Sequence, residues 1–295
     1  PNPDDTSVKN LLRQSVNLIS KFPLMAAYSY QAKAHYFDGK SLVIHKPRYE
    51  LSAAENLLML LRPSGEYTPL EAKILDLALV LHAEHGGGNN STFAAHVVSS
   101  SGTDIYSSLA AAIGSLKGPK HGGANSKVIG MMDELKREVR DWGNDSQIRD
   151  YLARIVMKEA FDRTGLIYGM GHAVYTLSDP RCVLLRKQAE ELARQKGRTE
   201  EFELHKSVER IAPEVFREIK KSDKPMCANI DFYSGFVYDM LGIPREMNTP
   251  IFAVARVVGW CAHIIEEHLN GGRIIRPAYK NIKRPMEYIR LQERG

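Results

Sequence analysis

The sequence predicts a mainly α-helical protein, and three observations carry this prediction. Apolar residues recur at intervals of three and four along most of the chain, helix-capping motifs precede several of these runs, and strand-like alternation is almost absent. The 295 residues suffice for one large domain or two ordinary ones. A content of 43% hydrophobic and 25% charged residues is typical of a soluble globular protein.

The first half of the chain contains strong helix signals. An apolar stripe over residues 8–19 predicts a helix that stops near Pro23, and residues 24–37 predict a second one. Two capping boxes follow, Ser52 with Glu55 and Thr68 with Glu71. The helix after Thr68 is apolar almost all round, so we expect it to be buried.

The remaining helices follow from the same reasoning. Residues 91–116 predict two helices with a break at 102–104, and further helices are expected over 124–139, 147–160, 181–196, 199–219, 230–240 and 250–269. Asp179-Pro180 predicts the cap and first turn of the helix that carries Arg181. Arg181 is then either a ligand-facing side chain or an exposed cation in a first helical turn.

Composition excludes several classes of protein. The net charge of +5 is spread among acids, so no nucleic-acid surface is expected, although small anions are attracted. Three widely spaced cysteines indicate a reducing, cytoplasmic compartment and no zinc ribbon. The most apolar window, residues 251–265, contains Arg256 and His263 and predicts no membrane span. No signal peptide opens the chain, which begins at Pro1 without a methionine.

Two glycine-rich loops carry histidines. His85 ends the buried helix before Gly86-Gly87-Gly88, where it either reaches a ligand or is a last-turn cation with Gly86 as the helix cap. His121 lies between Gly118-Pro119 and Gly122-Gly123, just before a helix N-terminus that disfavours imidazolium. We expect these glycines to let a ligand approach the main chain. A neutral His121 suits an oxyanion or enolate, and a loop histidine without a task is the alternative.

Two further segments offer chemistry. His172 follows Gly169-x-Gly171, a pair that admits a flat or anionic ligand but lacks the third glycine of a dinucleotide site. Asp231, at the start of a helix, is either an ordinary N-cap or a carboxylate held for proton transfer. Arg256 lies in an otherwise apolar turn, so we expect it to pair with a carboxylate.

Taken together, several histidines, one acid and several arginines at helix ends suit proton abstraction next to a carbonyl, with arginines holding a carboxylated partner. Here the sequence resembles the citrate synthase family, from about residue 51 to the C-terminus. The motifs that carry the resemblance are His82-Ala83-Glu84-His85-x-x-x-Asn89, Gly118-Pro119-x-His121-Gly122-x-Ala124-Asn125, Gly169-x-Gly171-His172-Ala173-Val174 through Asp179-Pro180-Arg181, and Asn229-Ile230-Asp231-x-x-Ser234-Gly235.

The resemblance implies an acyltransferase of the tricarboxylic acid cycle that condenses acetyl-CoA with oxaloacetate and hydrolyses citryl-CoA. Asp231 would be the base, His121 would hydrogen-bond the enolate, and His172 would protonate the oxaloacetate carbonyl. His85, Arg181 and Arg256 would hold oxaloacetate, and Arg276 would do so from the other subunit of a homodimer. No cofactor or metal is implied, because the CoA thioester is a substrate.

The resemblance also implies a helical fold in which a small domain, residues 124–234, closes over a cleft in a large one, residues 1–123 and 235–295. Relatives begin further upstream, so part of the large domain is expected to be missing. Candidate CoA contacts are Leu166, Gly169, Gly171, Lys224 and Asn229. Thr176, Met170 and Cys227-Ala228 depart from the family pattern, and these departures put CoA contacts in doubt more than the chemistry.

Other functions remain open from the sequence. A 2-methylcitrate synthase performs the same condensation with propionyl-CoA, and one methylene discriminates by only ~1–3 kcal/mol. A citrate lyase-type module shares similar motifs but needs nucleotide-binding segments, which are not visible here. From different classes, an inactive helical scaffold or a metal-dependent hydrolase that uses the histidines are the alternatives.

Overall fold

The computed structural model describes residues 2, 5–172, 174–278, 280, 282–284 and 286–294, and these are almost entirely helical. No strand is present within these residues, and the β-type pairing they contain is an isolated antiparallel bridge between Met170 and Ala228. This confirms the predicted fold class.

The described residues form eleven α-helices and two short 3-10 turns. The helices are α1 (Val8–Asp38), α2 (Ala53–Leu61), α3 (Pro69–His82), α4 (Asn90–Ser99), α5 (Ile105–Leu116), α6 (Ala124–Glu138), α7 (Asp145–Val156), α8 (Pro180–Gln195), α9 (Thr199–Lys220), α10 (Ile230–Met240) and α11 (Asn248–Leu269), and the 3-10 turns are η1 (Arg245–Met247) and η2 (Leu291–Glu293).

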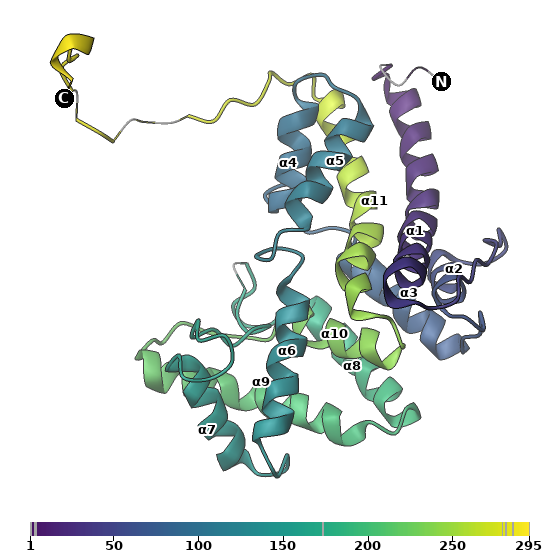
Figure 1. Cartoon of the computed structure of the whole chain (residues 1–295), viewed down its shortest axis with the longest axis vertical. Helices are drawn as coiled ribbons and strands as arrows, with labels where there is room; N and C mark the ends of the chain where they lie inside the picture. Colours follow the sequence, from purple (N-terminus) through teal and green to yellow (C-terminus); the bar gives the residue numbers. More distant parts are fainter. Residues whose placement is uncertain are drawn as a thin grey trace.

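The helices form two groups (Figure 1). In the first group, α11 packs against α1, α3, α4 and α5, and α1 packs against α2. In the second, α10 packs against α6 and α8, and α9 packs against α7 and α8. Contacts between α3 and α8 join the groups. The C-terminal tail extends away from both of them (Figure 1).

Helix α11 is the core helix of the first group. The segment Arg245–Leu269 is long and apolar enough to cross a membrane by length and composition, but 56% of its most apolar window is buried inside the protein. Arg256 and Trp260 are among the largest fully buried side chains. This burial explains why α11 is apolar: it is the core helix of a folded protein.

Helix α1 differs from the prediction, because it continues through Pro23 as one helix of 31 residues. A proline inside a helix removes one backbone hydrogen bond and crowds the preceding turn. Phe22, Pro23 and Ala27 are all buried, and α1 packs on both α2 and α11. Tertiary burial therefore offsets the local cost of the proline, and the predicted stop was wrong.

Both predicted capping boxes are present. The Ser52 and Thr68 hydroxyls accept from the backbone N–H groups of Glu55 and Glu71, whose carboxylates accept in return. Glu71 also accepts from Arg62 and Lys196. Although burial opposes ionisation, these ion pairs hold its pKa at about 2. Because Lys196 follows α8, this buried carboxylate ties the two groups of helices together.

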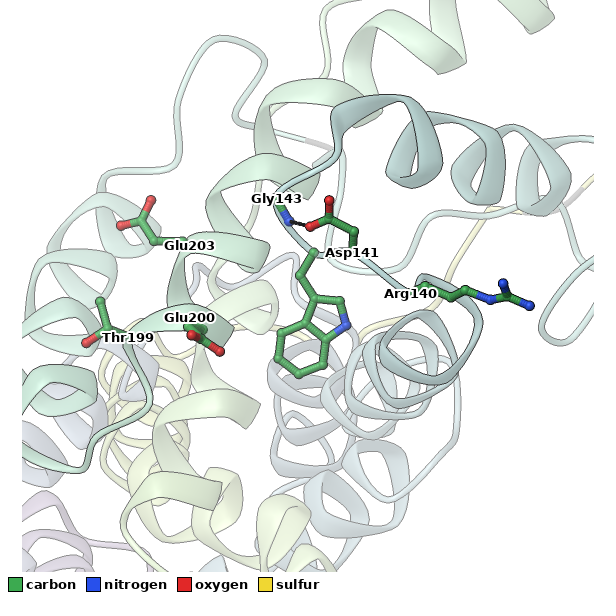
Figure 2. A pocket seen from close by; sticks show the side chains of 7 residues that line it. Arg140, Asp141, Gly143, Thr199, Glu200 and Glu203 are labelled. Carbon is green, nitrogen blue, oxygen red and sulfur yellow. Dashed lines mark hydrogen bonds between the residues drawn. The ribbon is translucent and has the colours of Figure 1, made fainter.

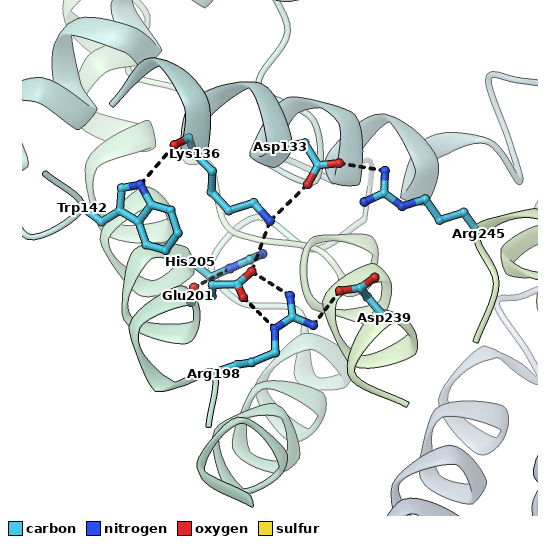
Figure 3. Close-up of polar contacts among 8 residues, drawn as sticks. All are labelled: Asp133, Lys136, Trp142, Arg198, Glu201, His205, Asp239 and Arg245. Carbon is cyan, nitrogen blue, oxygen red and sulfur yellow. Dashed lines mark hydrogen bonds and ion pairs between the residues drawn. The ribbon is translucent and has the colours of Figure 1, made fainter. Parts of the chain in front are cut away.

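The second group is held by an ion-pair network (Figure 3). Lys136 of α6 lies between Asp133 and Glu201, and Arg198 contacts both Glu201 and Asp239 of α10. Arg245, in η1, completes the network by pairing with Asp133 at 2.7 Å. The network therefore fixes α6, α9 and α10 relative to one another.

Most other predicted elements are confirmed, including the break between α4 and α5 and the cap of α8 at Asp179. Helix α7 ends at Val156 rather than at residue 160. Lys158 has a φ of 69°, and this left-handed conformation cannot continue an α-helix.

Candidate active site

His121 lies in the turn before α6, as predicted, and contacts the start of α4. Its Nε2 is 2.9 Å from Ser91 Oγ and 3.1 Å from Asn89 Oδ1. Trp260 donates from its indole N–H to the same Ser91 hydroxyl. Burial, followed by the charge of Arg256, lowers the pKa of His121, so the ring is neutral near pH 7. The predicted neutrality thus has burial as its main cause rather than the helix dipole.

The glycines beside His121 have a different purpose from the one predicted. A Cβ on Gly122 would lie 2.5 Å from the Leu116 carbonyl oxygen and 2.9 Å from Thr249, and one on Gly123 would lie 2.8 Å from Pro119. The space beside them is filled by the protein itself. The prediction that these glycines admit a ligand was therefore wrong, because they allow the turn to pack against its own neighbours.

The loop that carries His172 is fastened to the start of α10. Gly171 N–H donates to the Cys227 carbonyl and Asn229 N–H donates to the Gly169 carbonyl, which forms the isolated bridge. Gly169 has a φ of 79°, and a Cβ there would lie 2.9 Å from the Phe232 backbone. The space at Gly169 is thus filled by α10, contrary to the predicted ligand approach, whereas a Cβ on Gly171 would meet nothing within 4 Å.

His172 has a defined tautomer. Its Nδ1 accepts from the backbone N–H groups of Val174 and Tyr175, at 2.9 and 3.1 Å. The proton of the neutral ring is therefore on Nε2, which makes Nε2 a hydrogen-bond donor. Arg181 Nη2 is 3.4 Å away, and two donors at this separation leave a place for an oxygen that both can reach. Burial and the charge of Arg181 lower the pKa of His172.

Arg181 is held by Asp179. Nε and Nη2 of Arg181 donate to the two carboxylate oxygens at 3.0 and 2.8 Å, and the Arg181 backbone N–H donates to the same carboxylate. Asp179 is buried, and it also accepts from the N–H of Ile230 at the start of α10. The Arg181 side chain is only 13% exposed, so the alternative of an exposed first-turn cation is wrong.

His85 lies beyond the end of α3, which ends at His82. Its ring centroid is 5.0 Å from that of His172. Burial and the charges of Arg181, His172 and Arg256 lower its pKa to about 4. The neutral ring and its place outside the helix contradict the alternative of a dipole-favoured cation in the last turn.

Arg256 is 1% exposed and its contacts differ from the prediction. Nε donates to the His82 carbonyl at 2.6 Å, Nη1 donates to Asn89 Oδ1 at 3.2 Å, and the guanidinium lies over the Phe252 ring. No carboxylate pairs with it among the residues the structure describes, so the predicted ion pair was wrong. Burial lowers its pKa to about 10, which leaves it charged near pH 7. A buried cation with neutral partners favours an anionic ligand.

Asp231 is in the first turn of α10, but it is not the cap. Asn229 is the N-cap, and its side-chain oxygen accepts from the Asp231 N–H at 3.0 Å. The Asp231 carboxylate has no hydrogen-bond partner within the described part of the chain. Burial raises its pKa to about 6, against the opposing charges of Arg181 and Arg256. A carboxylate with a raised pKa and free lone pairs is suited to general-base chemistry.

The structure thus brings six of the predicted residues into one region. His85 lies against His172, His172 against Arg181, and His121 is joined to Arg256 through Asn89 Oδ1. Electrostatic interactions link Asp231 to Arg181 and Arg256. The region lies at the junction of the two groups of helices, because α3, α4 and α11 come from one and α8 and α10 from the other.

The other predicted residues lie elsewhere or are already engaged. Asn229 donates from its side-chain amide to the Gly171 carbonyl, so it holds the loop together. Leu166 and Lys224 are exposed. Arg276 is exposed on the C-terminal segment after α11, next to Ile275, whose backbone N–H donates to Ser100 Oγ just after α4. Ala173, part of the quoted motif, is outside the described residues.

A hollow at the start of α9 does not belong to this site. It has a volume of about 680 Å³ and is lined by Arg140, Asp141, Trp142, Gly143, Thr199, Glu200 and Glu203. Figure 2 shows Thr199, Glu200 and Glu203 on one side of it and Arg140 and Asp141 on the other. Because none of the predicted site residues line this hollow, it carries no part of the chemistry.

Sequence reasoning missed three contributors. Ser91 contacts His121, Asp179 holds Arg181 as well as capping α8, and Glu84 accepts from the backbone N–H groups of His85 and Gly86. Asp179 and Glu84 had a local signal, because each lies within two residues of the groups that it holds. The contact of Ser91 joins residues far apart in the sequence, so no spacing pattern reveals it.

Comparison with known proteins agrees with this geometry. Residues 1–278 match the family described as "Citrate synthase, C-terminal domain". A citrate synthase of Deinococcus radiodurans is 37% identical over 295 residues, which is 100% of this chain and 71% of the relative. A citrate synthase of Synechocystis is 36% identical over 280 residues, 95% of this chain and 64% of the relative. This chain thus spans about two thirds of their length.

Two further relatives bear on ligands. A 2-methylcitrate synthase of Shewanella oneidensis is 33% identical over 261 residues, 88% of this chain and 62% of the relative. The solved ternary complex of carboxymethyl coenzyme A and oxaloacetate with the citrate synthase of Thermoplasma acidophilum is 27% identical. The two structures superpose with a TM-score of 0.76, and the match covers 95% of this chain and 68% of that chain. On the family match and the identity to these relatives, the chain belongs to the citrate synthase family.

Proposed function

We propose that this chain is a citrate synthase that condenses acetyl-CoA with oxaloacetate and hydrolyses citryl-CoA to citrate and CoA. The single observation that carries the proposal is the setting of Asp231. Its carboxylate has a raised pKa, accepts no hydrogen bond from the described residues, and interacts with two arginines. The two arginines can bind the carboxylates of oxaloacetate, and the three neutral histidines can donate hydrogen bonds to carbonyl and enolate oxygens.

Oxaloacetate is held by the cations and imidazoles at the junction. Asp179 fixes the Arg181 guanidinium at two of its nitrogens, and Arg256 is fixed by His82 and Asn89. The remaining N–H groups of both arginines are available to the two carboxylates of oxaloacetate. His172 presents Nε2–H, which donates to the ketone oxygen, and His85 lies against His172 to complete the binding region.

Acetyl-CoA is activated by removal of a methyl proton. Asp231 takes that proton, and His121 stabilises the oxygen of the enolate through Nδ1–H. In this structure the Ser91 hydroxyl donates to Asn89 Oδ1 at 2.9 Å, and His121 Nε2 lies at the same distance from its oxygen. Rotation of the O–H toward Nε2 places the proton of the neutral ring on Nδ1. The enolate carbon then attacks the ketone carbon of oxaloacetate. The ketone oxygen takes a proton from His172 and becomes the hydroxyl group of citryl-CoA, whose thioester is hydrolysed by water.

The same proposal includes the assembly and the domains. Residues 124–234 form the small domain and residues 1–123 and 235–295 the large one, and their closure shields the thioester. Leu166, Gly171 and Lys224, which are exposed or have open space beside them, contact CoA, whereas Gly169 and Asn229 shape the loop that presents them. Arg276 enters the neighbouring site of a homodimer, and this fits its exposed place on a tail that leaves its own chain. The protein acts in the cytoplasm, in the tricarboxylic acid cycle.

The proposal is tested by measuring thiol release from acetyl-CoA and from propionyl-CoA, with and without oxaloacetate, before and after chelator treatment. Turnover that needs oxaloacetate, prefers acetyl-CoA and survives the chelator is expected. Preference for propionyl-CoA would instead make the protein a 2-methylcitrate synthase. Asp231→Ala should abolish turnover, while the control Asp150→Ala, at an exposed position of α7, should not. Oxaloacetate-independent release, or complete loss of release in the chelator, would overturn the proposal.

A further inference from the structure

A second histidine cluster lies outside the proposed active site, where α4 packs against α11. His96 comes from α4, and His263 and Glu266 lie one turn apart on α11. His96 Nε2 is 3.1 Å from His263 Nδ1, and His263 Nδ1 is 3.1 Å from Glu266 Oε2. One ligand atom from each residue lies within 4.8 Å of the others. Three donor atoms therefore converge on one point.

The second nitrogen of each imidazole is held by a separate carboxylate. Glu267 Oε2 is 2.9 Å from His96 Nδ1, and Glu84 Oε2 is 3.0 Å from His263 Nε2. Metal-bound histidines usually donate their other ring N–H to a carboxylate, which fixes the tautomer and raises ligand basicity. In the tautomers that donate to these carboxylates, His96 Nε2 and His263 Nδ1 each keep a lone pair on the side where the two nitrogens face each other, and a cation between them can accept both.

We propose that His96, His263 and Glu266 bind a divalent transition-metal ion such as Zn²⁺. Two imidazole nitrogens and one carboxylate suit Zn²⁺ and its neighbours, whereas Mg²⁺ and Ca²⁺ prefer oxygen ligands alone. With bonds of about 2.0–2.1 Å, tetrahedral zinc places its ligand atoms roughly 3.3 Å apart, close to the two separations of 3.1 Å that His263 Nδ1 makes with His96 Nε2 and Glu266 Oε2. The histidine side chains are 16% exposed and Glu266 is 58% exposed, so the ion and a fourth ligand from water enter past Glu266.

The bound ion also acts on the loop of His85. Glu84 Oε1 accepts from the backbone N–H groups of His85 and Gly86, while its Oε2 faces His263. A metal on Nδ1 fixes the proton of His263 on Nε2, and that N–H then donates to Glu84 permanently. We therefore expect the ion to rigidify residues 84–88. This expectation does not depend on the proposed activity.

Isothermal titration of the chelator-treated protein with ZnCl₂ tests the site. One ion per chain is expected, with a Kd in the micromolar range or tighter, and MgCl₂ should give no binding. His96→Ala and Glu266→Gln should each weaken binding at least tenfold. His268→Ala is the matched control, because His268 is on α11 but contacts only the Ile264 carbonyl among the described residues. Glu266 is exposed, so its variant should fold even if His96→Ala does not.

Hydrogen exchange gives an independent measurement. Zn²⁺ should slow amide exchange at residues 84–88 in the unaltered protein and in His268→Ala, but not in Glu266→Gln. Equal zinc affinity in all three variants would place the ion elsewhere, for example at His85 and His172, and would overturn the proposal. Absence of zinc binding to the unaltered protein, or equal binding of Mg²⁺, would overturn it as well.

Discussion

Asp179 holds Arg181 by three hydrogen bonds, two from the guanidinium and one from the backbone N–H. The same carboxylate accepts from the Ile230 N–H, which begins the helix that carries Asp231. One buried acid therefore sets the position of the arginine proposed to bind oxaloacetate and of the proposed base at the same time. The first prediction concerns this pair.

Asp179→Asn should destabilise the protein by about 2–4 kcal/mol and raise the KM for oxaloacetate. Asp179 accepts four hydrogen bonds, two at each carboxylate oxygen. In the asparagine variant an NH₂ group replaces one of these oxygens, and it cannot accept from the N–H groups that face it. Urea unfolding and oxaloacetate titration measure both effects. Asp145→Asn is the control, since the Asp145–Arg210 pair is more than half exposed and should cost under about 1 kcal/mol. Equal losses in the two variants would contradict this role.

The fall of activity at low pH, the acid limb of the pH–rate profile, should follow the ionisation of Asp231. The base works only when ionised, and burial raises its pKa to about 6. We expect kcat/KM for acetyl-CoA to fall tenfold per pH unit below about pH 6 and to be level just above it. His85, with a pKa of about 4, is neutral throughout the upper part of this range. An acid limb near pH 4, the ordinary range of an aspartate, would show that Asp231 is not the titrating base.

Asp231→Asn should abolish turnover and yet raise the free energy of unfolding. A folded-state pKa above the unfolded value means that the folded protein binds more protons between about pH 4 and pH 6. Stability contributed by the protonated acid is therefore lost as the pH rises through 6. Removal of the charge should restore up to about 3 kcal/mol at pH 8, measured by urea unfolding. The gain should vanish near pH 4, and an unchanged gain there would argue against a charge effect.

Ser91→Ala should lower kcat by about tenfold to a hundredfold with little change in the KM for oxaloacetate. Without the hydroxyl, no residue that the structure describes is placed to donate to His121 Nε2 and keep the proton on Nδ1, so enolate stabilisation is weakened. Ser108→Ala is a matched control, because Ser108 is equally buried and bonds only to the Asp104 carbonyl among the described residues. A fall in kcat of the same size in both variants would indicate a packing effect instead.

Gly169→Ala should destabilise the protein more than Gly171→Ala does. Both glycines have a φ near +80°, so the backbone strain of an alanine is similar. Only at position 169 does the new Cβ overlap with the Phe232 backbone, whereas position 171 is open. We expect a difference of roughly 2 kcal/mol in urea unfolding, typical of overpacking. Similar losses at both positions would show that α10 does not close against the loop.

The sequence alone determined the helices, most of their caps and which residues are proposed to react. Local signals sufficed there: the periodicity of α6 and α11, the capping boxes at Ser52 and Thr68, and the motifs around His85, His121, His172 and Asp231. These features depend on neighbours within a few residues, so the order of residues in the chain contains them. The stop at Pro23 failed because burial against α2 and α11 outweighs a local cost.

Only the tertiary structure decided what surrounds each of those residues. It gave Arg256 a carbonyl and an amide in place of the expected carboxylate, and it filled the space beside Gly122 and Gly169 with protein. It also set Ser91 against His121 and assembled His96, His263 and Glu84 from three separate segments. Hydrogen bonds, desolvation and pKa shifts depend on distances between segments remote in the chain, and folding alone fixes those distances.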